Sequence, residues 1–253
     1  MRQLPFYALP LLLAAPSLLA ATPGPRLFAA LSQPRVEISY GFAGAELLVY
    51  GAVQYPRGRI PDDEPRIAIV ARGPDMPIVV RQKARRMGIW INAASQTFAT
   101  APSYVAVATS RPVDELLDPQ TAALWEIGLG NLALAPRGDA IRAGEFARGL
   151  LDLRRRAGLY RQEPYGVHVT ENILYRARLV IPPAAPVGAY RVAVHLIEDG
   201  QVVASVERPL DVRKTGFEAG VSDFAARHGF WYGLAAVVLA VGTGWAASWA
   251  GRR

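Results

Sequence analysis

The chain has no cysteine among its 253 residues. Disulfides, thiolate metal sites, thiol nucleophiles and lipid attachment through cysteine are therefore excluded. Histidine is scarce as well, and His168 and His195 lie in strand-like segments far apart in the sequence. No paired spacing such as HxH or HExxH brings histidines together, so the sequence predicts no metal site.

Motifs for nucleotide binding and covalent catalysis are also missing. The sequence holds no GxSxG nucleophile elbow, no phosphate-binding loop and no GxGxxG segment between a strand and a helix. The adjacent carboxylates Asp62, Asp63 and Glu64 lack the alternating spacing of a calcium loop, so we expect a solvated turn there. We predict that the chain is not an enzyme and uses no cofactor.

The N-terminal end is short and apolar. Residues 1–21 combine the positive charge of Arg2, an apolar stretch and a tail of small residues, which predicts a cleaved secretory signal peptide. The alternative is an uncleaved anchor. Pro5, Pro10 and Pro16 interrupt the apolar run and leave it short for a spanning helix, which disfavours that alternative.

The C-terminal end carries the clearest signal in the sequence. Residues 230–250 contain no charged residue and match the length of a transmembrane helix. Trp231 and Trp245 stand toward its two ends, where aromatic side chains favour the membrane interfaces. Arg252 and Arg253 follow it, and cations favour the cytoplasmic side. We expect a single-pass protein of the cell inner membrane with its body in the periplasm and its C-terminus in the cytoplasm.

Small residues recur every four positions within this predicted span. A close approach between helices in lipid needs small side chains, because packing must replace the hydrophobic effect there. The stripe is therefore a candidate contact with an integral membrane protein; chance in an alanine-rich segment is the alternative. Its members are Ala236, Ala240, Gly244 and Ser248.

The charge balance is basic, with 28 Lys and Arg against 21 Asp and Glu, or a net +7. The cations are scattered, which argues against nucleic-acid binding, and lipid headgroups are a better match for a protein tethered to a membrane. Arg81, Lys83 and Arg85 alternate and so share one face of an expected strand. This basic face is a candidate binding surface for anions or headgroups. The alternative, which we favour, is a solvent face or a protected sheet edge.

The body between the two ends reads as mainly β. Short β-prone runs alternate with turn residues, and the segment around 113–160 has helical spacing, with Phe146, Leu150, Leu153 and Ala157 on one side. The Pro-Val-Gly-x-Tyr turn before Tyr190, followed by an Asp-Gly hairpin, is typical of the close of an immunoglobulin-like sandwich. Expected strands are Val36–Tyr40, Glu46–Gln54, Arg66–Arg72, Pro77–Arg85, Gly88–Asn92, Tyr104–Ala108, Tyr165–Ile181, Tyr190–Ile197 and Val202–Pro209, with Leu210–Lys214 closing.

These patterns predict an immunoglobulin-like β-sandwich with inserted helices and one C-terminal transmembrane helix. The domains are then a signal peptide at 1–21, a periplasmic domain at 22–215 with its helical insertion, a juxtamembrane helix at 216–229, the span at 230–250 and a tail at 251–253. We expect residues 22–34 to be an extended lead-in. Tyr190, Trp90 and Trp125 are expected to pack in the core.

Several segments in this order resemble an alphaproteobacterial family of transmembrane proteins without an established activity. They include VEISYGFAGAELLVYGA at 36–52, RQKARRMGIWIN at 81–92 and PPAAPVGAYRV at 182–192, with ARGP at 71–74, SYVAVATSRP at 103–112, GFEAGVSDFA at 216–225 and FWYGLAAVVLAVGTGW at 230–245. The resemblance implies an envelope location and one C-terminal span, and it supplies no catalytic residue.

Two hypotheses of function follow. The first is a membrane-anchored periplasmic accessory protein that interacts with an integral membrane partner such as a transporter. The second is a periplasmic protein that binds an anion or another small solute through the basic face at Arg81, Lys83 and Arg85. Neither involves nucleic acid, and both keep the chain at the lipid bilayer.

Overall fold

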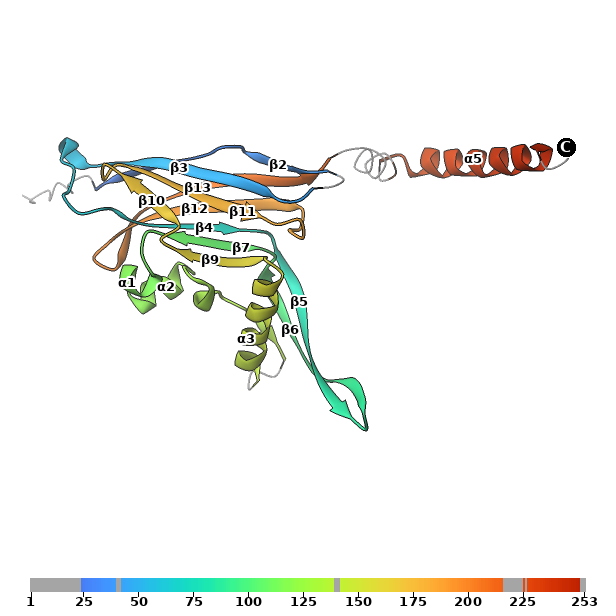
Figure 1. Cartoon of the computed structure of the whole chain (residues 1–253), viewed down its shortest axis with the longest axis horizontal. Helices are drawn as coiled ribbons and strands as arrows, with labels where there is room; N and C mark the ends of the chain where they lie inside the picture. The colour runs from blue at the N-terminus through green and yellow to red at the C-terminus, as the bar shows by residue number, and fades with distance from the viewer. Residues whose placement is uncertain (1–23, 40–41, 139–141, 216–224, 226, 251–253) are drawn as a thin grey trace, which may run out of the picture.

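The structure is a computed structural model that describes residues 24–39, 42–138, 142–215, 225 and 227–250. The predicted signal peptide, most of the predicted juxtamembrane helix and the predicted cytoplasmic tail lie outside these residues. The described part is mainly β, as the sequence predicted, and combines two large sheets, a projecting β-ribbon, a group of helices and a C-terminal helix (Figure 1).

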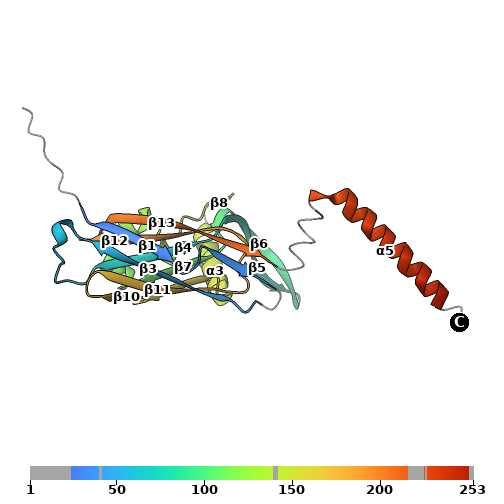
Figure 2. The same cartoon turned by 90° about the horizontal axis from the view of Figure 1, so that it is seen from above.

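Two sheets make up the main body. Sheet A has the order β1-β3-β11-β10 and is antiparallel throughout, whereas sheet B has the order β2-β13-β12-β4-β7-β9 with parallel pairs at both edges. The strands of the two sheets overlie one another when seen from above (Figure 2). Their bounds are β1 Arg26–Leu31, β2 Arg35–Ile38, β3 Ala45–Gln54, β4 Arg66–Arg72, β7 Val105–Thr109, β9 Tyr160–Pro164, β10 Val167–Thr170, β11 Leu174–Ile181, β12 Gly188–Glu198 and β13 Gln201–Lys214.

One hydrophobic core fills the space between the sheets. Leu47 and Val49 on β3 and Leu179 on β11 meet residues of β4, β7 and β12, and all belong to one buried cluster. The central strand β4 reads IAIVA without alternation and is buried on both faces, because the helical segments cover the outer side of sheet B there. The body is therefore a two-sheet sandwich.

Buried tyrosines tie the sandwich together through backbone carbonyls. The Tyr104 hydroxyl donates to Val180 O at 2.7 Å, and the Tyr175 hydroxyl donates to Phe28 O at 2.7 Å. Burial raises the pKa of both hydroxyls, so they remain neutral donors. Tyr175 passes over Gly51 of the intervening strand, where a Cβ would overlap its ring and the Phe28 carbonyl. Glycine is required at this crossing because the backbone and the ring approach so closely.

The helical segments follow β7 and precede β9 in the sequence, and they lie below sheet B in Figure 1. They are α1 Val113–Leu116, α2 Pro119–Leu124, the 3-10 turn η2 Leu129–Asn131 and α3 Ala143–Arg156, and a further 3-10 turn, η1, spans Pro56–Gly58. Of the four residues predicted on one side of α3, Phe146 and Leu150 are buried, whereas Leu153 and Ala157 are exposed. Arg154–Arg156 lie in the last turn, where cations favour the helix dipole.

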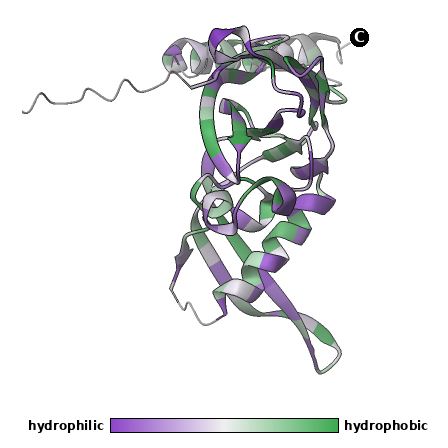
Figure 3. Ribbon diagram, turned by 90° about the vertical axis from the view of Figure 1, so that its left-hand side faces the viewer, coloured by the Kyte–Doolittle hydropathy of each residue, from purple (hydrophilic) through white to green (hydrophobic). Residues whose placement is uncertain are grey.

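A third sheet leaves the sandwich. It comprises β5 Asp75–Arg86, β6 Ile89–Pro102 and the short β8 Pro136–Arg137 in the order β5-β6-β8. We call β5 and β6 with the turn between them the arm. It extends away from both large sheets, and its far end has no neighbouring element (Figures 1 and 3).

The C-terminal helix α5 spans Gly229–Ala250, and none of its described side chains belongs to either hydrophobic core. Its described large apolar side chains, among them Phe230, Leu239 and Trp245, are exposed. Among the residues that the structure describes, no helix combines the length and the apolar character that crossing a membrane requires.

Several predictions about the body were wrong in detail. Residues 26–31 form strand β1 of sheet A rather than an extended lead-in, because they pair along β3. The segment Tyr165–Ile181 is a hairpin of β10 and β11 rather than one strand, with a turn at Glu171 and Asn172, both at positive φ. Strand β6 extends to Pro102, far beyond the predicted end at Asn92.

Candidate functional site

The arm is the most distinctive surface of the molecule. Its inner half is supported by a small core separate from that of the sandwich, formed by Val80, Phe98, Ala101, Phe146 and Leu150. Arg142, just before α3, also donates to Gln82 Oε1 of β5 at 2.6 Å. Helix α3 therefore braces the inner half of the arm, and its support ends near Gln82.

The outer half of the arm is fully exposed. Every residue from Arg85 to Ala93 is exposed, and the apolar members stand out: Met87 is 103% exposed, Ile89 67% and Trp90 65%. We call Met87–Ile91 the apolar tip; it is green in Figure 3. The prediction that Trp90 fills the core was wrong, because the ribbon carries it beyond every element that could cover it.

The turn at the tip is strained. Met87 (φ 49°) and Gly88 (φ 82°) both have positive φ, the signature of a two-residue type I′ turn between Arg86 and Ile89. Glycine fits this conformation, but a methionine in the left-handed region is unfavourable, and Asn or Asp is usual at that position. An apolar side chain is thus held fully exposed at a position where a polar residue would be more stable in water.

The predicted basic face lies on this arm. Val80 and Gln82 contact the α3 side, so alternation along β5 directs Arg81, Lys83 and Arg85 to the opposite face, where all three are exposed. Arg86 adds a fourth cation beside the turn. The ion pairs formed among described residues include none of these four cations. Strand β5 is also an edge of its sheet, as the structural interpretation of the basic face expected.

The arm is joined to the body at a charged corner. Arg72, the last residue of β4, forms ion pairs with Glu126 and with Asp75 (3.7 Å), the first residue of β5. Glu126 follows α2 and also accepts a hydrogen bond from Ala133 N at 3.3 Å. These contacts fix the start of the arm relative to sheet B and the helical segments.

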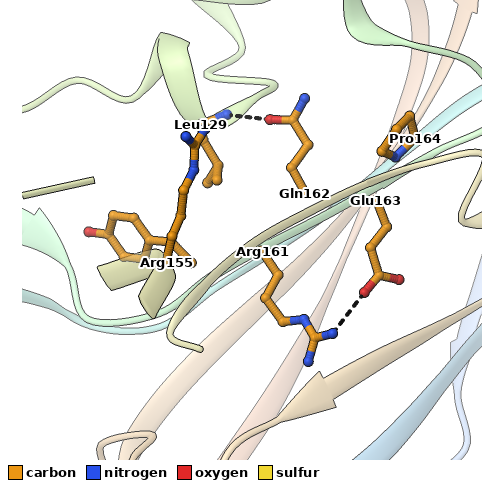
Figure 4. A pocket seen from close by; sticks show the side chains of 7 residues that line it. Leu129, Arg155, Arg161, Gln162, Glu163 and Pro164 are labelled. Atoms are coloured by element: carbon orange, nitrogen blue, oxygen red, sulfur yellow. Dashed lines mark hydrogen bonds and ion pairs between the residues drawn. The ribbon is translucent and has the colours of Figure 1, made fainter. Parts of the chain in front are cut away.

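An open groove of about 560 Å³ runs along the edge strand β9 (Figure 4). Most of its polar groups already have partners: Gln162 Oε1 accepts from Leu129 N at 2.9 Å, and Arg161 pairs with Glu163 at 3.3 Å. The hydroxyl of Tyr160 donates to Pro102 O at 2.6 Å, and burial raises the pKa of Tyr160 to about 12. These contacts hold β9 in place, and they leave no arrangement of a nucleophile and a base.

A second groove of about 580 Å³ lies on the outer face of sheet A. His168, Arg176 and Arg178 line it together with Glu46 and Glu163, so its charges are mixed. Within the described residues, no three His, Asp or Glu side chains gather as metal ligands would. The two histidines of the body lie on different sheets, His168 on sheet A and His195 on sheet B.

His195 is a buried residue of β12. It is 4% exposed, its Nδ1 has no partner among the described residues, and its ring lies 5.2 Å from that of Trp125 in an edge-on arrangement. Burial lowers the pKa of His195 to about 4, so the ring is neutral at ordinary pH. Trp125 is 41% exposed and covers this histidine; the prediction that it is a core residue was therefore wrong.

The candidate helix contact lies on α5. Ala236, Ala240, Gly244 and Ser248 are spaced by four and thus share one face of the helix, and all four are exposed. A Cβ added at Gly244 meets no atom within 4 Å. The described structure therefore leaves this face open to a neighbouring helix.

The chain combines a two-sheet β-sandwich, a projecting arm and a separate C-terminal helix. Over residues 26–253 it matches the family described as "Putative transmembrane protein (Alph_Pro_TM)", and it belongs to that family. The resemblance seen in the sequence is thereby confirmed. No curated protein and no solved structure matches this chain.

Proposed function

We propose that this protein is a non-enzymatic accessory protein of the cell envelope, anchored by α5 in the cytoplasmic membrane, with its body in the periplasm and an integral membrane protein as its partner. The observation that carries the proposal is α5 itself. It is a 22-residue helix whose described apolar side chains are exposed and belong to neither core. Such a helix needs an apolar environment outside the chain.

The membrane span rests on the whole sequence of the helix and on the family. Positions 230–250 have no charged residue, and 22 residues at 1.5 Å each give roughly 33 Å, close to the thickness of a hydrocarbon core. The run includes positions 246, 249 and 250, whose side chains lie outside the described residues. The family description as transmembrane points the same way.

The immunoglobulin-like character of the sandwich is part of this proposal. The Tyr190 hydroxyl donates to Pro186 O at 2.5 Å, four residues upstream, at the start of β12. This is the geometry of the tyrosine corner found in immunoglobulin-like domains. Many cell-surface domains share this architecture, and the fit to an accessory protein is an analogy of fold alone.

The test is a substitution on the small-residue face. Gly244→Leu adds a side chain that meets nothing in the isolated chain, so the body keeps its fold, while a closely packed partner helix is pushed away. We expect the partner captured by crosslinking in native membranes to be lost from the Gly244→Leu protein. Gly242→Leu is the matched control, because residue 242 lies about 200° around the helix from residue 244 and is equally open. Equal capture by both variants would rule out a partner on this face.

A further inference from the structure

We propose that the tip of the arm is a second membrane contact: Met87–Ile91 inserts into the interfacial region of an anionic bilayer, with Arg81, Lys83, Arg85 and Arg86 binding lipid headgroups. The proposal uses a different surface from the small-residue face of α5. It rests on the proposed function only in requiring that the chain be held at a membrane.

The first argument is the pattern of apolar and charged side chains. At the end of the arm, Arg85 lies opposite Trp90 and Arg86 lies opposite Ile89 in the strand pairing. Trp90 and Ile89 thus each have a cation opposite them, whereas Ile91 lies opposite Ala84. Long cationic side chains and tryptophan both favour the boundary between headgroups and acyl chains, where an apolar part and a polar end are satisfied together.

The second argument is the charge of the whole arm. After Asp75, which pairs with Arg72 at the base of the arm, the sequence has no acidic residue until Asp114, so the rest of the arm carries four cations and no carboxylate. The cations at 81, 83 and 85 lie in a row along an extended strand at roughly 7 Å spacing, rather than converging on one point. A row of this kind matches an extended anionic surface better than a single small anion.

The third argument is position. Gly188 pairs with Val212 of β13, two residues before that strand ends at Lys214, and a Cβ at Gly188 would lie 2.9 Å from Pro74. The base of the arm and the exit of the chain toward α5 are therefore at the same end of the sandwich, as Figure 1 also shows. The arm leaves the body on the side where the chain continues to the anchor.

The fourth argument is reach. Strand β5 has 12 residues, which gives the arm a length of roughly 37 Å. Residues 215–228 connect β13 to α5 and can span at most roughly 50 Å even when fully extended. The body is therefore held within roughly 50 Å of the bilayer, and an arm of roughly 37 Å spans most of that distance.

The exposed apolar tip is unfavourable in water, and a membrane contact would offset this. A two-stranded ribbon beyond its supporting core is only marginally stable in water, and the apolar tip is a liability there. Insertion of Met87, Ile89 and Trp90 removes them from water and restrains the strained turn. A docking site for another protein would use the same apolar residues. It would not account for the four cations on the arm, which pair with no carboxylate among the described residues and which anionic headgroups would neutralise.

The absence of cysteine allows a direct test on the full chain. Met87→Cys and, as a control, Asp63→Cys are each labelled with an environment-sensitive fluorophore. Asp63 lies just before the first residue of β4, whereas the arm begins just after its last residue, so the control lies at the opposite end of β4 from the base of the arm. The proteins are reconstituted in vesicles of phosphatidylglycerol and phosphatidylcholine, or of phosphatidylcholine alone. We expect a blue-shifted label at 87, quenched by spin-labelled acyl chains, in the anionic vesicles only, and a water-exposed label at 63 in both.

Two variants separate the parts of the contact. Replacing the four cations by glutamate in the Met87→Cys protein is expected to abolish the blue shift, since each cation near the surface contributes about fivefold to membrane association. Ile89→Ser with Trp90→Ser keeps the charges and is expected to lose acyl-chain quenching. Both sets of side chains are exposed, so circular dichroism should report an unchanged fold.

The outcomes are decisive. A label at 87 that stays water-exposed in anionic vesicles, or that is protected equally in neutral ones, overturns the proposal. Protection that appears only in native membranes, together with a protein crosslink at 87, assigns the tip to a protein partner instead. Resistance of the full chain to salt extraction reports anchoring by α5 separately, so a failure of the tip and a failure of the anchor give different results.

Discussion

The sandwich and the arm use β-structure in opposite ways. In the sandwich, the two sheets cover one another across a shared core. Even the hydroxyls of Tyr104 and Tyr175 have hydrogen-bond partners there. In the arm, two long strands leave that core, retain a small support at their inner half and expose apolar residues at their end. The sandwich buries most of its apolar side chains, whereas the arm leaves those at its end exposed and holds them away from the body. This difference suggests that the arm is retained for binding rather than for stability.

The most severe test of this comparison uses the same substitution in both regions. Ile67 of β4 is 0% exposed, and Ile89 is at the tip. Ile67→Ala removes buried atoms and leaves a cavity, so we expect the free energy of unfolding to fall by about 2–5 kcal/mol. Ile89→Ala should change it by less than about 0.5 kcal/mol. Urea unfolding of the full chain in detergent measures both; similar losses would mean that the tip is packed against the body.

The second prediction concerns pH and the buried histidine of the sandwich. The pKa of His195 is about 4 in the folded chain and about 6.5 in the unfolded chain, so only the unfolded state takes up a proton between these values. Stability is therefore unaffected above pH 6.5 and falls by about 1.4 kcal/mol per unit as the pH drops toward 4, to a total of about 3 kcal/mol.

His195→Leu tests this assignment. Leucine has a similar size and no titrating group, so the variant should lack this part of the acid destabilisation. Unfolding curves at a series of pH values, taken on both proteins, give the difference directly. A parallel fall in both proteins would show that His195 is not the group responsible.

The sequence predicted the sandwich strands well where local patterns determine them. β4 was predicted with the observed bounds, because its apolar run is bounded by turn residues, and the Asp199-Gly200 turn was predicted because its dipeptide favours positive φ. Strand β1 was missed, since its pairing with β3 is long-range and its sequence has weak β-propensity. The second half of β6 was missed for the same reason: its conformation depends on its partner β5.

The sequence predicted only part of the candidate site. Alternation was enough to place Arg81, Lys83 and Arg85 on one face of a strand, and the structure has them so. Trp90 was misplaced because hydrophobicity predicts that a residue favours burial, but it cannot say whether any element is there to bury it. One signal was available: the segment RRMGIWIN joins cations to an apolar turn in a stretch without acidic residues.

The smallest effect on global stability is expected where the two regions meet. Phe146 of α3 packs in the small core that supports the arm. Phe146→Ala should loosen the arm locally, because the sandwich core does not include this residue. We expect amide exchange in β5 and the paired part of β6 to accelerate by at least about tenfold, with exchange in β4 and β12 unchanged. Arg148→Ala is the control, because Arg148 is exposed about 200° around the same helix from Phe146, and it should leave both regions as they were. Faster exchange throughout the sandwich would mean that arm and body unfold as one unit, and the distinction between them would then be one of shape alone.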